Sequence, residues 1–113
     1  MKVLATSLSG VPLLKVIGDV DHSTSPALDQ SVQEALGPNG MRLFLDLADC
    51  PYFDSGGLSV LLCTLRQLSG KGWLGVIAPG PNVLRLFEIL GLTVAPDFRV
   101  FAETADAKAA LEG

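Results

Sequence analysis

A short apolar run leads directly into a helix start in residues 43–57, which read LFLDLADCPYFDSGG. Such a run is typical of a central strand covered on both faces. Asp54 and Ser55 follow it, and either can cap the free backbone N–H groups of a helix. Gly56 and Gly57 carry no side chains that would block another molecule from approaching those groups. A hydroxyl at Ser55 can therefore receive a phosphoryl group, because the partial positive charge of a helix N-terminus tolerates a new dianion.

The residues before this stretch predict a hairpin and a helix. Two apolar, partly alternating runs, Val3–Leu8 and Val11–Val20, are separated by Ser9-Gly10, as in a β-hairpin with a tight turn. Apolar residues then recur at helical spacing. We expect this helix to begin within Ser23–Pro26 and to end at Gly37-Pro38.

The remaining residues predict two more strands and three more helices around the central strand, and the leucines of the first of these helices should all be buried. These elements are the central strand Met41–Leu47, a helix from Ser55 to about Gly70, a strand Trp73–Ala78, a helix from Val83 to Leu90, a short edge strand within Val94–Phe101 and a helix Glu103–Leu111. The order β-β-α-β-α-β-α-β-α predicts a single α/β domain over residues 1–113. We expect a mixed sheet of four to five strands with about four helices packed on it.

Composition restricts the classes of partner. The chain has 113 residues, 49% of them hydrophobic, and a formal net charge of −4, which argues against binding a nucleic-acid backbone. No apolar run approaches the roughly 20 residues of a membrane-spanning helix, and the N-terminus lacks the shape of a secretory signal. We therefore expect a cytoplasmic protein. Cys50 and Cys63 are interpreted as small buried hydrophobic residues, with a disulfide between them disfavoured.

Catalytic and metal-binding motifs are missing from the sequence. It contains no G-x-G-x-x-G and no G-x-x-x-x-G-K-[ST], so no motif indicates a nucleotide pocket. His22 is the one histidine, which leaves too few ligands for a zinc site and one candidate base for a serine hydrolase. Asp21 and Asp54 could be an acid–base pair, but two carboxylates at strand ends are common by chance. We expect no catalytic residue, no metal, no cofactor and no enzymatic activity.

Four segments, in order, resemble the STAS domain of bacterial anti-sigma factor antagonists. They are Gly18-Asp19-Val20-Asp21, Leu43-Phe44-Leu45-Asp46-Leu47, Tyr52-Phe53-Asp54-Ser55-Gly56-Gly57-Leu58 and Phe87-Glu88-Ile89-Leu90-Gly91-Leu92. The resemblance covers nearly the whole chain. It implies a small cytoplasmic switch: the unphosphorylated form binds an anti-sigma factor, which is usually also the serine kinase, and so releases a sigma factor. A PP2C-type phosphatase reverses the phosphorylation.

The resemblance also assigns roles to individual residues. Ser55 follows Asp54 as the acceptor serine does in the family's D-S-[SG]-G segment, so it is the expected phosphorylation site. Asp21, Asp54, Ser55, Gly56 and Gly57 are the expected partner-binding residues. Gly56 stands where many members carry a second serine or threonine, which leaves one phosphosite in the motif.

Two alternatives remain open at this point. The first is a non-phosphorylated STAS scaffold or transport-complex subunit. The second is a small enzyme or ligand-binding domain, which would need a closed pocket with convergent polar groups beside Ser55. Asp46, in the central strand, is expected to be a structural carboxylate that accepts hydrogen bonds from nearby backbone N–H groups, and His22 to lie on the surface near the partner-binding residues.

Overall fold

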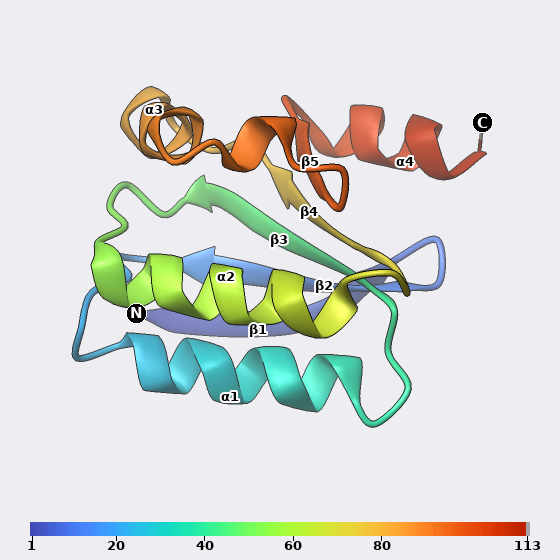
Figure 1. The fold of residues 1–113 in the computed structure, drawn as a ribbon, viewed down its shortest axis with the longest axis horizontal. Helices are drawn as coiled ribbons and strands as arrows, with labels where there is room; N and C mark the ends of the chain where they lie inside the picture. The colour runs from blue at the N-terminus through green and yellow to red at the C-terminus, as the bar shows by residue number, and fades with distance from the viewer. Residues whose placement is uncertain (113) are drawn as a thin grey trace.

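The computed structural model describes residues 1–112 and forms one five-stranded mixed sheet with four α-helices (Figure 1). The elements are β1 (Lys2–Leu8), β2 (Val11–Ile17), α1 (Ser25–Leu36), β3 (Arg42–Asp49), α2 (Ser55–Leu68), β4 (Trp73–Ile77), α3 (Pro81–Ile89), the 3₁₀-helix η1 (Leu92–Val94), β5 (Phe98–Phe101) and α4 (Thr104–Glu112). The strands lie in the order β1-β2-β3-β4-β5. β1 is antiparallel to β2 and the other neighbours are parallel. The predicted fold class and order of elements are confirmed.

The first hairpin has the tight turn that its sequence predicts. Ser9 and Gly10 both have positive φ, 49° and 83°, and the register pairs Leu8 with Val11 across them. Two residues with positive φ give the turn a twist that matches that of the flanking strands. The turn therefore sets the register of β1 on β2.

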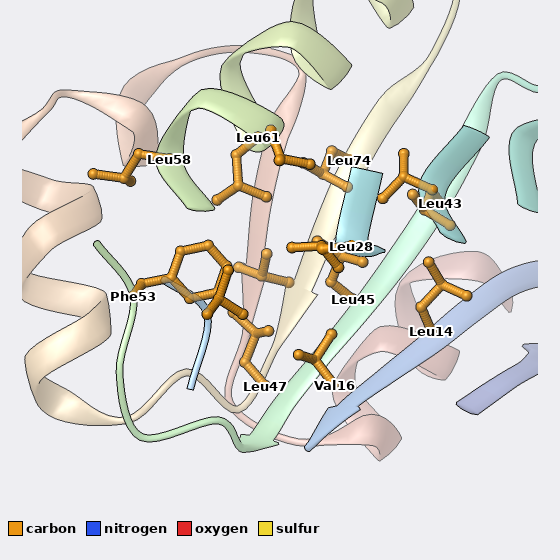
Figure 2. Close-up of a cluster of buried hydrophobic side chains, with 14 of the residues drawn as sticks. Leu14, Val16, Leu28, Leu43, Leu45, Leu47, Phe53, Leu58, Leu61 and Leu74 are labelled. Atoms are coloured by element: carbon orange, nitrogen blue, oxygen red, sulfur yellow. The ribbon is translucent and has the colours of Figure 1, made fainter. Parts of the chain in front are cut away.

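Alternation along β3 divides the core between the two faces of the sheet. Leu43, Leu45 and Leu47 pack in the larger cluster, together with apolar side chains of α1, α2 and α3. Figure 2 shows members of this cluster from both the sheet and the helices. Phe44 points to the other face, where it packs with Ala107 of α4 in a second cluster. β3 is thus covered on both faces, as its apolar sequence predicts.

The aromatic side chains of the second cluster meet edge to face. The ring of Phe44 lies 5.0 Å from that of Trp73 and 6.0 Å from that of Phe101, centroid to centroid. These distances are favourable for aromatic pairs. Within residues 1–112, α4 is the helix that covers this face, whereas three helices cover the opposite one.

Several details differ from the expectations. β2 ends at Ile17 rather than Val20, because Gly18 has a φ of +96° and turns the chain out of the strand. Leu62 is 46% exposed and Cys63 is exposed, although both were expected to be buried. The buried stripe of α2 includes Leu61, and at 100° per residue the next positions rotate toward solvent.

No helix within residues 1–112 has the length and apolar character needed to cross a membrane.

Candidate functional site

Two loops meet at the carboxyl ends of β2 and β3, next to the starts of α1 and α2 (Figure 1). The N–H of Val20 donates to the carbonyl of Tyr52 (2.9 Å), and the N–H of Asp54 donates to the carbonyl of Val20 (3.1 Å). Val20 and Phe53 form an isolated parallel bridge. This short pairing places the loop that carries Asp21 beside the loop that carries Asp54.

The carboxylate of Asp54 connects the two loops. Its Oδ1 accepts hydrogen bonds from the N–H groups of Gly56 (2.8 Å) and Gly57 (3.4 Å) in the first turn of α2. Its Oδ2 accepts one from the N–H of His22 (3.1 Å), 32 residues earlier in the sequence. The sequence left open whether Asp54 or Ser55 caps this helix, and the structure assigns the cap to Asp54.

Ser55 is the first residue of α2 and its side chain is exposed. Its backbone carbonyl accepts a hydrogen bond from Oγ of Ser59 (3.0 Å), whereas its own hydroxyl has no partner among residues 1–112. An exposed hydroxyl at a helix start is accessible to another enzyme. The structure thus leaves the hydroxyl of Ser55 accessible at the surface.

The two glycines take part in the helix cap and in the packing around it. Their N–H groups already donate to Asp54, so they are not open to an approaching molecule, and Gly57 is buried. A Cβ atom on Gly57 would lie 2.6 Å from Cδ2 of Phe53 and 2.7 Å from a methyl of Val20. The site therefore requires a glycine at this position for internal packing, and the role of Gly57 in partner binding stays a prediction.

Gly56 also permits close packing, but at the surface between the loops. A Cβ atom at this position would lie 3.0 Å from Cα of His22 and 3.1 Å from Oγ of Ser25. A side chain here would fit only if its neighbours shifted by a few tenths of an ångström. His22 is exposed and lies beside Asp54, in agreement with its predicted surface position.

Asp21 organises the loop before α1. Its Oδ1 accepts hydrogen bonds from the hydroxyl of Ser23 (2.7 Å), the N–H of Ser23 (2.9 Å) and the N–H of Thr24 (3.0 Å). These donors, above all the Ser23 hydroxyl and then the Thr24 N–H, hold the pKa of the Asp21 carboxyl below its ordinary value. Asp21 is therefore a fixed negative charge at this site.

Sequence reasoning missed Ser23 and Thr24 as donors to Asp21. The hydroxyl of Thr24 accepts a hydrogen bond from the N–H of Asp21 (2.9 Å), so each of these two residues holds the other in place. Aspartate followed two and three residues later by Ser and Thr is a pattern for side-chain-to-backbone turns, and that signal could have found them.

Other polar groups have structural roles. Asp46 Oδ1 accepts a hydrogen bond from the N–H of Ala48 (3.0 Å), as expected for a structural carboxylate. Cys50 is buried, and burial raises the pKa of its thiol. Cys50 and Cys63 are both free thiols. In residues 1–112, no group of three or more His, Cys, Asp or Glu side chains lies close enough to hold a metal ion.

The hollow beside Ser55 is an open groove between α1 and α2 with a volume of about 640 Å³. A second hollow of about 460 Å³ lies between the end of β3 and the start of α3. An open groove differs from the closed pocket that a small enzyme would need beside Ser55.

Comparisons with known proteins agree on the family. Residues 4–99 match the family model described as "Mlab, STAS domain". The anti-sigma-F factor antagonist RsfB of Mycobacterium tuberculosis is 30% identical over 105 residues, which are 93% of this chain and 84% of RsfB. The crystal structure of an anti-sigma factor antagonist from Mycobacterium paratuberculosis superimposes with a TM-score of 0.87 at 28% identity, covering 99% of this chain and 94% of that one.

A more distant structure has the same fold. SpoIIAA in its unphosphorylated form matches with a TM-score of 0.78 at 16% identity, over 99% of this chain and 98% of that one. The chain therefore belongs to the STAS domain family. Within that family, its similar named relatives are bacterial anti-sigma factor antagonists.

Proposed function

We propose that this protein is an anti-sigma factor antagonist, and that it binds an anti-sigma factor that is also its serine kinase. In the unphosphorylated form it holds this partner and releases the sigma factor. Phosphorylation of Ser55 ends the binding, and a PP2C-type phosphatase restores it. The protein acts as substrate and ligand rather than as catalyst, in the cytoplasm.

The observation that carries the proposal is the position of Ser55. Its exposed hydroxyl stands at the first residue of α2, with no partner among residues 1–112, beside a helix cap built from Asp54. Exposure allows a kinase to reach the oxygen, and the Asp54 cap orders the first turn of the helix that carries it. The name of RsfB, a relative that aligns with most of this chain, supports the same function.

The chemistry of the kinase explains how the phosphate ends the complex. To phosphorylate Ser55, the partner must bring the γ-phosphate of ATP into contact with its hydroxyl. The product carries about −1.5 to −2 charges at that point. The new phosphate on Ser55 therefore lies against the remaining phosphates of the nucleotide. The N–H groups of Gly56 and Gly57 could otherwise bind this phosphate, but they already donate to Asp54.

The size of the effect follows from the cost of such a contact. An unpaired charge buried at an interface costs several kcal/mol. A loss of about 4 kcal/mol corresponds to roughly a thousandfold weaker binding. The switch then needs no refolding of the domain.

The test compares two variants at Ser55 and a control at Ser59, another exposed serine one turn further along α2. Ser55→Ala should bind the anti-sigma partner as the wild type does, and Ser55→Asp should bind more weakly. With kinase and ATP, intact mass should show one added phosphate on the wild type and on Ser59→Ala, and none on Ser55→Ala. Equal affinity of Ser55→Ala and Ser55→Asp, or a phosphate mapped elsewhere, would refute the proposal.

The second candidate is a non-phosphorylated STAS subunit of a scaffold or transport complex. The description of the matching family model names Mlab and the STAS domain but no anti-sigma factor, which keeps this candidate beside the first. Capture of Ser55→Ala from its native cell separates the two candidates. Recovery of transport-complex chains in place of an anti-sigma factor would select this alternative.

A further inference from the structure

A groove runs between α1 and α2, the two helices that begin at the candidate site. α1 and α2 lie side by side (Figure 1) and cover the same face of the sheet. The groove between them begins at Gly56, next to Ser55, and reaches Cys63. The seven-residue rise along α2 from Gly56 to Cys63 is roughly 10 Å. Beyond Cys63, Nε2 of Gln33 donates to Oε1 of Gln67 (3.0 Å) and bridges the helices.

The lining of the groove is suited to an amphipathic occupant. Val60 and Pro26 supply apolar surface, and Ser25 and Ser59 add neutral polar groups. Asp29 is the one carboxylate among the described residues that line it. The groove therefore offers space for an apolar side chain of a partner. Asp29 supplies a negative charge at the edge of the groove.

The surrounding surface is acidic over a long stretch of sequence. From residue 16 to residue 65 the chain has a single Lys or Arg, Arg42, and it opens β3 at the end of the sheet away from the acceptor loops. The same stretch places five carboxylates on the two acceptor loops and on α1: Asp19, Asp21, Asp29, Glu34 and Asp54. Asp21 is held as a fixed charge by its hydrogen bonds. A partner that docks here must supply positive charge.

We propose that the groove binds a basic, amphipathic segment of the anti-sigma partner. An apolar side chain of this segment enters between α1 and α2 against Val60, and a Lys or Arg pairs with Asp29. The inference rests on the proposed function, since it assigns part of the docking surface of that same partner. Because the groove opens beside Ser55, the segment and the catalytic site of the kinase contact one continuous surface.

The exposed thiol of Cys63 gives a direct probe of the groove, since Cys50 is 1% exposed and stays protected. The rate of N-ethylmaleimide addition to Cys63, followed by intact mass, should fall at least tenfold when the complex with the anti-sigma factor forms. The matched control is Cys63→Ser combined with Thr6→Cys, which moves the thiol to an exposed position on β1. Its rate should be unchanged by the partner.

Each other outcome of this labelling experiment counts against the groove. If gel filtration shows the complex and Cys63 still reacts at the free rate, the groove proposal is wrong and the proposed function stands. Protection that rises with the protein's own concentration, without a partner, would mean that a second copy fills the groove. Failure to form any complex with the cognate anti-sigma factor would overturn both proposals.

A charge reversal tests the pairing with Asp29. Asp29→Lys should weaken binding to the anti-sigma factor about ten- to a hundredfold, and salt should weaken the binding of the wild type more than that of Asp29→Asn. The control is Glu34→Lys, on the same helix but outside the groove lining, which should change the affinity less than threefold. Equal effects of the two lysine variants would show that only net charge matters and would overturn the assignment to the groove.

Discussion

Removal of the Asp54 carboxylate should destabilise the domain without any partner present. In Asp54→Ala, the N–H groups of Gly56 and Gly57 lose their acceptor in the first turn of α2, and the N–H of His22 loses the bond that connects the two loops. The side chain at the start of a helix is worth about 1 kcal/mol, with a range of roughly 0.5–2. The His22 bond is exposed, so water replaces most of it. We expect the free energy of unfolding to fall by about 1–2 kcal/mol.

Asp54→Asn separates the helix cap from the charge and from the bond to His22. Asparagine caps a helix about as well as aspartate, so its oxygen keeps the bonds to Gly56 and Gly57. This variant should lose the interaction with the helix dipole, about 0.3–1 kcal/mol, and the exposed bond from His22, because an amide nitrogen cannot accept it. The measurement is urea denaturation at pH 7, monitored by circular dichroism. The slope of the unfolding free energy against urea concentration should be the same for all three proteins. The predicted order of stability is wild type, then Asn, then Ala.

The control is Asp49→Ala, which removes another carboxylate at the carboxyl end of β3. Asp49 makes an exposed ion pair with Lys15 (3.4 Å), and such pairs contribute about 0–1 kcal/mol. Its loss should therefore cost less than that of Asp54. If the free energy of unfolding of Asp54→Ala lies within about 0.5 kcal/mol of the wild-type value, the capping carboxylate does not stabilise the site as described.

Three further predictions concern packing, pH and thiol reactivity. Gly57→Ala should cost about 1–3 kcal/mol in the free energy of unfolding, measured with urea, because its Cβ would lie 2.6 Å from the Phe53 ring. Because the pKa of Asp21 is lowered from 3.8, its carboxylate stabilises the fold above about pH 4 and loses that effect as the pH falls through the lowered pKa. The stability difference between wild type and Asp21→Asn should accordingly be constant from pH 7 to about pH 4 and shrink below it. Native protein should react with a thiol reagent at Cys63 alone, and Cys50 should react only after unfolding, since burial raises the pKa of its thiol.

Local patterns in the sequence determined the order of the elements. Apolar alternation marked the strands, leucine spacing marked α2, and the Ser9-Gly10 pair marked the first turn, since each signal depends on neighbours in the chain. The same local chemistry identified Ser55 as a residue at a helix start. The element bounds were less accurate, as at Gly18, where a backbone turn ends β2 early.

The tertiary structure decided everything at the site that depends on residues far apart in sequence. Only the packing of one loop on the other shows that the carboxylate of Asp54 also accepts a hydrogen bond from His22, and that Gly57 is buried. The groove between α1 and α2, with Cys63 exposed along it, likewise exists only once both helices lie on the sheet. The physical reason is that a residue's neighbours along the chain fix its backbone preference, whereas its burial, its hydrogen-bond partners and the space beside it are set by segments that folding brings together.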